Sequence, residues 1–217
     1  MITAILWDLD GTLLDTLNDL ADSVNVSLSA FGFPTHSRER IRSFVGNGVY
    51  KLIARAVPAG TDEASETAVR EFFQKHYGEH ANDTTAPYPG ILPLLRELRD
   101  AGVKMAVVSN KPDFATKALV RQHFGDLIST AVGGRDGIPV KPAREMVQLG
   151  LDALGVTAEE TVYIGDSEVD VQTAKNAGMR GISVDWGFRD ESVLRDAGAQ
   201  TVAHTAEQLR REIFSQP

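Results

Sequence analysis

Seven polar side chains stand after apolar, β-branched-rich runs of the sequence, where the carboxyl ends of parallel strands would bring them together. They are Asp8, Asp10, Ser109, Asn110, Lys141, Asp166 and Asp170. Four carboxylates in one crevice repel one another, so they need a cation, shared protons or both. Oxygen ligands favour Mg²⁺, which commonly joins one or two carboxylates to a phosphate and to water. The set therefore predicts a magnesium-dependent site for a phosphate group.

Position within the set suggests individual roles. Asp8 is the expected nucleophile, because a carboxylate that attacks phosphorus divides a hard hydrolysis into two steps through an aspartyl phosphate. Asp10, two residues further on, is expected to donate a proton to the leaving oxygen and then to withdraw one from water. The metal is expected on Asp8, Asp166 and the backbone carbonyl of Asp10. Asp170 is expected behind these ligands or bound through water.

The phosphate oxygens also need hydrogen-bond donors. We expect them from the backbone amides after the first apolar run, from Ser109 with its neighbour Asn110, and from the Lys141 ammonium. Ser109 is also suited to cap the helix that begins near Pro112, and the two roles are compatible. Lys141 has the alternative of a solvated surface lysine, but its place before Pro142 in a strand-end loop favours contact with phosphate.

The apolar runs predict a parallel sheet covered by helices. They occupy residues 2–7, 103–108, 130–132, 161–164 and 181–184. Longer helical patterns lie between the later runs, at residues 92–101, 145–154 and 170–177, and each is followed by a glycine that suits a helix end. This alternation is typical of a doubly wound, Rossmann-like α/β fold.

One stretch interrupts the alternation between the first and second runs. Residues 16–85 show helical periodicity without a convincing strand, in segments near 17–28, 38–45, 49–57 and 62–80. Pro87, Pro89 and Gly90 suit turns at a domain boundary. We therefore predict a catalytic core formed by residues 1–15 and 86–217, with residues 16–85 inserted as a mobile four-helix cap.

Composition limits the remaining classes of function. The 217 residues carry a formal charge of −8 with a pI near 5.1, which disfavours a nucleic-acid or anionic-membrane partner. The absence of cysteine excludes disulfides, zinc–thiolate sites and cysteine nucleophiles. No run approaches the roughly 18 apolar residues of a spanning helix. We expect a cytoplasmic monomer or homodimer that binds a small phosphorylated metabolite.

The ordered motifs resemble those of the haloacid dehalogenase superfamily. They are WDLDGTLLDT at the start, VVSNK around Ser109, Lys141-Pro142, and YIGDSEVD around Asp166, and they extend over nearly the whole chain. The resemblance implies phosphatase chemistry, a helical cap and the roles given above. This chain continues Lys141-Pro142 with Ala143 and Arg144, where the family often has a second proline two residues on, so the local loop shape is expected to differ.

Four further segments look like the phosphoglycolate phosphatase branch of that superfamily. They are DTLNDLADSVN, FVGNGV, PYPG and VDWGF. The resemblance implies a two-carbon phosphate ester as substrate. Related branches hydrolyse pyrophosphate, nucleotides or sugar phosphates, or act as phosphomutases, with much the same catalytic residues. Cap residues are expected to decide among these alternatives.

Several positions keep two interpretations. Arg42 suits either a solvated helix face or a substrate carboxylate. Gly46, Asn47 and Gly48 form either a turn between cap helices or a segment that faces the site on closure. Asp15 suits the hinge as well as a ligand contact, and it stays outside the predicted site.

Other residues have ordinary structural explanations. Alone, Asp166 and Asp170 are typical of a helix N-cap and its first turn, but beside Asp8 and Asp10 the site interpretation prevails. Trp186 and Phe188, in the VDWGF segment, are expected to pack near the site. The five histidines show no zinc-like constellation.

Two non-enzymatic functions are alternatives to hydrolysis. A phospho-receiver also gathers aspartates, a hydroxyl and a lysine on a parallel sheet, but the helical insertion and the DLDGT segment count against it. A catalytically silent binding protein of the same fold is the second, although every expected reactive residue is present.

Overall fold

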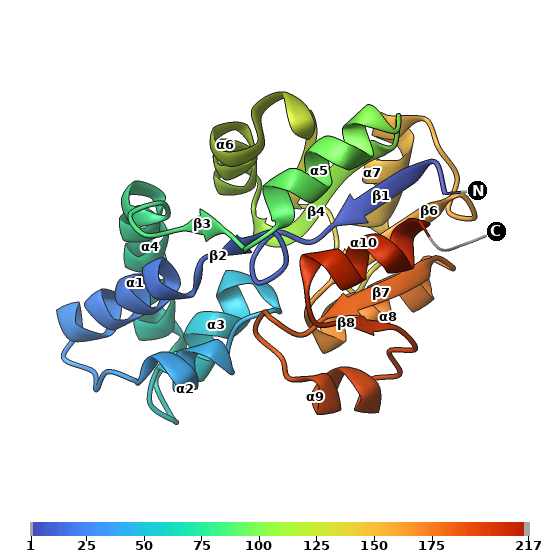
Figure 1. Ribbon diagram of the computed structural model, residues 1–217. Helices are drawn as coiled ribbons and strands as arrows, with labels where there is room; N and C mark the ends of the chain where they lie inside the picture. Colours follow the sequence, from blue (N-terminus) through green and yellow to red (C-terminus); the bar gives the residue numbers. More distant parts are fainter. Residues whose placement is uncertain (1, 215–217) are drawn as a thin grey trace.

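The computed structural model describes residues 2–214 and contains a six-stranded parallel sheet (Figure 1). Its strands lie in the order β5-β4-β1-β6-β7-β8. They are β1 (Ala4–Trp7), β4 (Lys104–Pro112), β5 (Thr130–Gly134), β6 (Thr161–Gly165), β7 (Arg180–Val184) and β8 (Val202–Ala203). Because the chain leaves the central β1 first toward β4 and later toward β6, the sheet has its topological switch beside β1. The carboxyl ends of these three strands are therefore neighbours.

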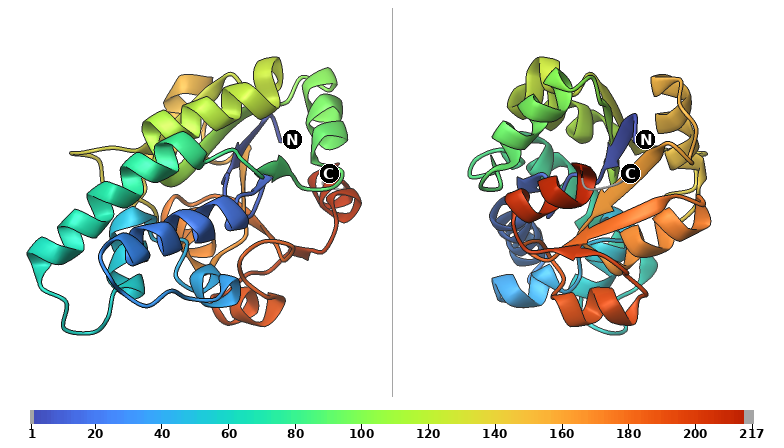
Figure 2. Two further views of the ribbon diagram at one scale, coloured as in Figure 1. Left: turned by 90° about the vertical axis from the view of Figure 1, so that its left-hand side faces the viewer. Right: turned by 45° about the vertical axis from the view of Figure 1, so that its right-hand side comes forward.

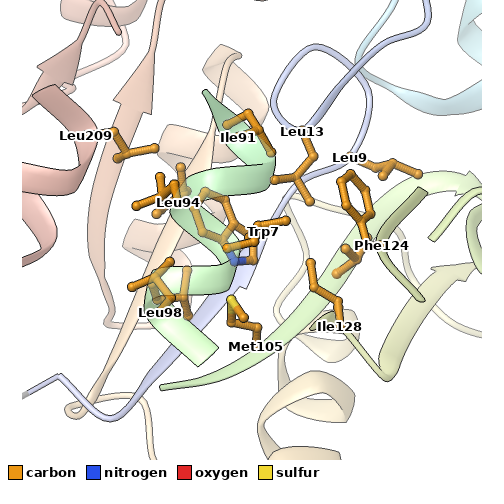
Figure 3. Close-up of a cluster of buried hydrophobic side chains, with 14 of the residues drawn as sticks. Trp7, Leu9, Leu13, Ile91, Leu94, Leu98, Met105, Phe124, Ile128 and Leu209 are labelled. Carbon is orange, nitrogen blue, oxygen red and sulfur yellow. The ribbon is translucent and has the colours of Figure 1, made fainter. Parts of the chain in front are cut away.

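Helices cover both faces of the sheet. On one face, α5 (Ile91–Asp100), α6 (Asp113–Phe124) and α10 (Ala206–Phe214) enclose an apolar cluster around the fully buried Trp7 (Figure 3). On the other, α7 (Glu145–Leu154) and α8 (Glu168–Asn176) pack against Leu6 and Tyr163. Burial on both sides explains why the central strands read as continuous apolar runs.

Local signals fix where several of these helices begin and end. Ser167 caps α8 in a reciprocal capping box with Asp170, so its hydroxyl and the Asp170 carboxylate satisfy backbone amides of the first turn. Gly155 ends α7 in the left-handed conformation. Gly90, with φ of 82°, precedes α5, and a side chain there would overlap the Ala206 methyl group. A 3₁₀ turn, η1 (Gly125–Leu127), and a short helix, α9 (Glu191–Asp196), complete the connections of this part.

A helical region lies at the carboxyl side of the sheet (Figures 1 and 2). It comprises α1 (Leu17–Ala30), α2 (Arg38–Arg42), α3 (Gly48–Ala56) and α4 (Glu63–His80). These helices share an apolar cluster of their own that includes Val24, Ile53 and Phe73. Two short antiparallel strands, β2 (Leu14–Asp15) and β3 (Ala86–Pro87), carry the chain into the region and back.

The predicted α/β architecture with an inserted helical region is confirmed. The five predicted strands are present, but β4 continues past Val108 through Ser109 to Pro112 with an irregular register against β5. The short β8 and the helices α9 and α10 were not predicted. Among the described residues, 2–214, no helix combines the length and apolar character needed to cross a membrane.

Candidate active site

Lys141 holds two of the predicted carboxylates together at the end of the sheet. Its Nζ lies 2.9 Å from Asp8 Oδ1, 2.8 Å from Asp170 Oδ1 and 2.9 Å from the Tyr163 hydroxyl. The Lys141 side chain is 2% exposed. Burial lowers the pKa of the Lys141 ammonium, but Asp170 and Asp8 outweigh it and raise that pKa well above its ordinary value. Lys141 is therefore a fixed cation beside the expected nucleophile.

Asp166 approaches the same point from the end of β6. Its Oδ1 accepts a hydrogen bond from the Thr12 hydroxyl at 2.9 Å, and its Oδ2 accepts one from the Phe188 amide at 2.6 Å. The backbone packs tightly around this carboxylate, because a methyl group added at Gly11 or Gly187 would overlap it. Both glycines therefore keep Asp166 in place next to Asp8.

The buried aspartates form a site that a divalent cation would fit. Oxygen atoms of Asp8, Asp166 and Asp170 lie within 4.8 Å of one another. Burial, together with the charge of Asp170, raises the pKa of Asp8 to about 7, although Lys141 acts in the opposite direction. Burial and the neighbouring carboxylates also raise the pKa of Asp166 well above its ordinary range. A cation among these oxygens would favour their charged forms, and oxygen donors suit Mg²⁺.

Asp170 contributes to this cluster from a different position. Its Oδ1 accepts hydrogen bonds from Lys141 at 2.8 Å and Tyr163 at 3.1 Å. Its Oδ2 accepts hydrogen bonds from the Ser167 hydroxyl at 2.6 Å and the Ser167 amide at 3.1 Å. The Asp170 carboxylate therefore orients Lys141 and α8, whereas Asp8 and Asp166 line the cleft.

Ser109 and Asn110 project from the irregular end of β4. Ser109 is 2% exposed and lines the cleft together with the aspartates. The Asn110 side chain accepts a hydrogen bond from the Lys141 amide at 2.8 Å and donates to the Lys141 carbonyl at 3.0 Å. It also donates to the Gly46 carbonyl of the helical region at 3.2 Å. Asn110 thus fixes the loop that carries Lys141. Its contact with phosphate stays a prediction.

Asp10 contacts Lys111, a residue to which the sequence analysis assigns no role. Lys111 Nζ lies 3.0 Å from Asp10 Oδ1 and 3.3 Å from its Oδ2, and it also contacts the Tyr77 hydroxyl from α4. The VVSNK segment contains Lys111 directly after Asn110, so its position at the strand end was a usable signal. Tyr77 gave no such signal, because its spacing on α4 is that of an ordinary core residue.

The predicted cap positions separate into two groups. Gly46 and Gly48 line the cleft, next to Asn110. The Asn47 side chain instead accepts a hydrogen bond from Arg55 at 2.7 Å. Arg42 donates to the Gly187 carbonyl at 2.8 Å and to Asp190 at 3.0 Å, so it joins the helical region to the loop after β7.

The cleft itself lies between the sheet and the helical region. Its atom-free volume, open mouth included, is about 540 Å³. The floor consists of Asp8, Asp10, Asp166 and Ser109. Its other walls are mainly apolar and come from Leu20, Val45, Val49, Leu52 and Phe188.

The comparisons with known proteins agree with this arrangement. A model of the haloacid dehalogenase-like hydrolases matches residues 5–184. The chain belongs to this family. It is 34% identical over 215 residues to a phosphoglycolate phosphatase of Pseudomonas syringae pv. tomato, covering 96% of this chain and 78% of that protein. A phosphoglycolate phosphatase of Vibrio parahaemolyticus is 32% identical, with 96% and 94% covered.

Solved structures of this family share the fold. One from Lactobacillus delbrueckii subsp. bulgaricus, provisionally assigned as a phosphoglycolate phosphatase, has a TM-score of 0.94 and 36% identity over 99% of both chains. CbbY from Rhodobacter sphaeroides, solved in complex with phosphate, has a TM-score of 0.76 and 29% identity over 96% of both chains. The predicted family and the predicted class of enzyme, a phosphoglycolate phosphatase-like hydrolase, are therefore confirmed.

Proposed function

We propose that the chain is a magnesium-dependent phosphatase that hydrolyses a small phosphate monoester, with phosphoglycolate as its substrate. The observation that carries this proposal is the Asp8 carboxylate, which lies at the floor of the cleft within 2.9 Å of the buried Lys141 ammonium. Asp10 and Ser109 line the same cleft. A nucleophile, a proton carrier and donors for phosphate oxygens thus face one small space.

The first step joins substrate to protein. An Asp8 carboxylate oxygen attacks phosphorus and forms an oxygen–phosphorus bond, while the bond from phosphorus to the leaving oxygen breaks. Asp10 gives its proton to the leaving oxygen, so the alcohol departs neutral at that atom. The Ser109 hydroxyl and the Lys141 ammonium stabilise the charge on the phosphoryl oxygens.

The second step restores the protein. A water molecule attacks phosphorus, Asp10 withdraws a proton from that water, and the bond between phosphorus and Asp8 breaks to release phosphate. Asp8, Asp166 and the backbone carbonyl of Asp10 are the groups that would hold Mg²⁺. When bound, the ion would neutralise the aspartates and polarise a phosphoryl oxygen.

The choice of substrate rests on the relatives. Several relatives that match most of this chain are named phosphoglycolate phosphatases. We propose that residues 16–85 act as a cap that encloses the small substrate and excludes water during the first step. The apolar side chains that this region contributes to the cleft support the role.

The mechanism is tested by replacing the nucleophile. We expect purified protein with Mg²⁺ to release phosphate from phosphoglycolate faster than from pyrophosphate, nucleoside monophosphates or sugar phosphates at equal concentration. Asp8→Asn should remain folded by circular dichroism and lose this activity by at least about 10³-fold, whereas the exposed Asp126→Asn should not. Undiminished turnover in Asp8→Asn would refute the mechanism, and faster hydrolysis of a large sugar phosphate would refute the substrate.

A further inference from the structure

Lys111 is a second buried lysine of the site, and it lies on the Asp10 side of the cleft. Its side chain is 2% exposed, and its ammonium contacts both Asp10 oxygens. The ammonium also lies 4.4 Å from the centre of the Tyr77 ring, whose hydroxyl it contacts. Tyr77 is 3% exposed and comes from α4, so the helical region holds this lysine from above.

The charges around the cleft give Lys111 a distinct position. Among the described residues that line the cleft, Lys111 is the only cation, and its charged companions are Asp8, Asp10 and Asp166. Lys141 is not part of that lining, and its ammonium contacts Asp8 and Asp170. A ligand that enters the cleft therefore meets one ammonium in the cleft lining, next to the residue proposed to protonate the leaving oxygen.

The contact between Lys111 and Asp10 has to loosen during turnover. Both Asp10 oxygens lie within 3.3 Å of Lys111 Nζ, yet an Asp10 oxygen must turn to the leaving oxygen to transfer a proton. A buried ammonium that loses a carboxylate partner needs another one. An anionic group on the leaving alcohol, one carbon from the ester oxygen, would lie close enough to contact Lys111 while its ester oxygen contacts Asp10.

We propose that Lys111, oriented by Tyr77, binds the carboxylate of the leaving group and thereby selects phosphate monoesters of 2-hydroxy acids. This inference rests on the proposed phosphatase function and assigns the residues that recognise the carboxylate of the substrate. The Tyr77 hydroxyl shares the ammonium with the incoming carboxylate. Because Tyr77 belongs to the helical region, the subsite is complete only when that region is seated on the sheet.

A substrate pair isolates this role from general effects on catalysis. Phosphoglycolate carries a carboxylate at the position where 2-hydroxyethyl phosphate carries a hydroxymethyl group. We expect the wild-type protein to prefer phosphoglycolate by at least about 100-fold in kcat/KM, because a site built for a charged group strongly rejects an analogue without it. Lys111→Met should reduce this ratio at least about tenfold, and Tyr77→Phe should reduce it about threefold. The exposed Lys117→Met, on α6, is the matched control and should leave the ratio unchanged.

A binding measurement separates this inference from the proposed reaction. The non-hydrolysable pair 3-phosphonopropionate and 3-hydroxypropylphosphonate reproduces the same difference, and calorimetry with Mg²⁺ gives both affinities without turnover. We expect the carboxylated ligand to bind at least about tenfold more tightly to the wild-type protein, and this preference to disappear in Lys111→Met.

An unchanged preference in folded Lys111→Met and Tyr77→Phe would overturn the assignment of Lys111, even if phosphoglycolate is the substrate. Equal binding of both phosphonates by the wild-type protein would overturn it as well. Conversely, absence of phosphate release from either ester would refute the proposed function, while a carboxylate preference that depends on Lys111 in calorimetry would still support the subsite.

Discussion

Asp19 joins the first helix of the helical region to the segment that returns to the sheet. Its carboxylate, on a residue only 3% exposed, accepts hydrogen bonds from the amides of Thr84 and Thr85 at 2.9 Å. It also accepts hydrogen bonds from the hydroxyls of Thr84 at 2.6 Å and Thr85 at 2.7 Å. One buried carboxylate thus satisfies four donors beside the paired strands β2 and β3.

Replacing Asp19 with asparagine should destabilise the fold. The amide retains one acceptor oxygen, and its NH₂ group faces donors, so about two of the four hydrogen bonds become unfavourable. Since buried hydrogen bonds to a charged acceptor contribute about 1.5–3 kcal/mol each and are not additive, we expect a loss of about 3 kcal/mol. In a chain of this size that loss corresponds to a fall in Tm of about 6–12 °C.

The loss should also depend on pH. Burial raises the pKa of the Asp19 carboxyl, but the hydrogen bonds from Thr84 and Thr85 outweigh burial and lower it overall. A carboxylate with a lowered folded pKa contributes stability that is fully present above its unfolded pKa of about 3.9 and is lost as pH falls through the folded value. The difference between wild type and Asp19→Asn should therefore be constant from about pH 5 to 7 and shrink below about pH 4.

Urea unfolding at several pH values measures this prediction. Asp22→Asn is the matched control, because Asp22 lies on the same helix and is exposed, and it should change the free energy of unfolding by less than about 0.5 kcal/mol. A loss below about 1 kcal/mol in Asp19→Asn at pH 7, or an equal loss at pH 7 and pH 3.5, would refute this account of the connection.

Three further changes test the site and its neighbours. Gly187→Ala should lower kcat at least about tenfold and weaken the binding of Mg²⁺, because the added methyl group overlaps the Asp166 carboxylate. A Mg²⁺ titration that matches wild type would contradict this. Tyr163→Phe removes a hydroxyl 2.9 Å from Lys141 Nζ, so kcat should fall about tenfold with little change in KM, as steady-state kinetics can show. Arg189→Gln loses hydrogen bonds to two carbonyls of the helical region, at 2.7 and 3.1 Å, and should lower kcat/KM about tenfold without changing the far-ultraviolet circular dichroism; unaltered kinetics would exclude a role in seating that region.

The sheet was predictable because its signals are local and repeated. Central strands buried on both faces must be apolar along their whole length, so 161–164 and its counterparts stand out from the sequence. The short β8 has only two residues and little apolar pattern, and β4 extends past Val108 because the irregular register still pairs Pro112 with Gly134. Pairing with a neighbouring strand, which depends on tertiary structure, decides such boundaries.

The convergence of the site residues was also predictable, since strand order places residues after neighbouring strands at one edge. Asp8, Asp166, Asp170 and Lys141 lie within one connected group of contacts, as expected. The contact between Lys111 and the helical region was not predictable in the same way. It joins Lys111 to the Tyr77 hydroxyl across 34 positions of sequence, and it depends on how the helical region is seated.

The loop after β7 shows how seating of the helical region and the position of Asp166 depend on each other. The Phe188 amide holds Asp166, while the Phe188 ring is buried in the apolar cluster of the helical region. Burial of such a ring contributes about 2 kcal/mol, which corresponds to about a thirtyfold change in the population of the seated arrangement. Arg42 adds a hydrogen bond from α2 to the Gly187 carbonyl of the same loop. A displacement of the helical region therefore moves the Asp166 carboxylate, which is proposed to hold the metal. The same displacement withdraws Tyr77 from Lys111. Metal binding and substrate selection are therefore expected to respond to one movement.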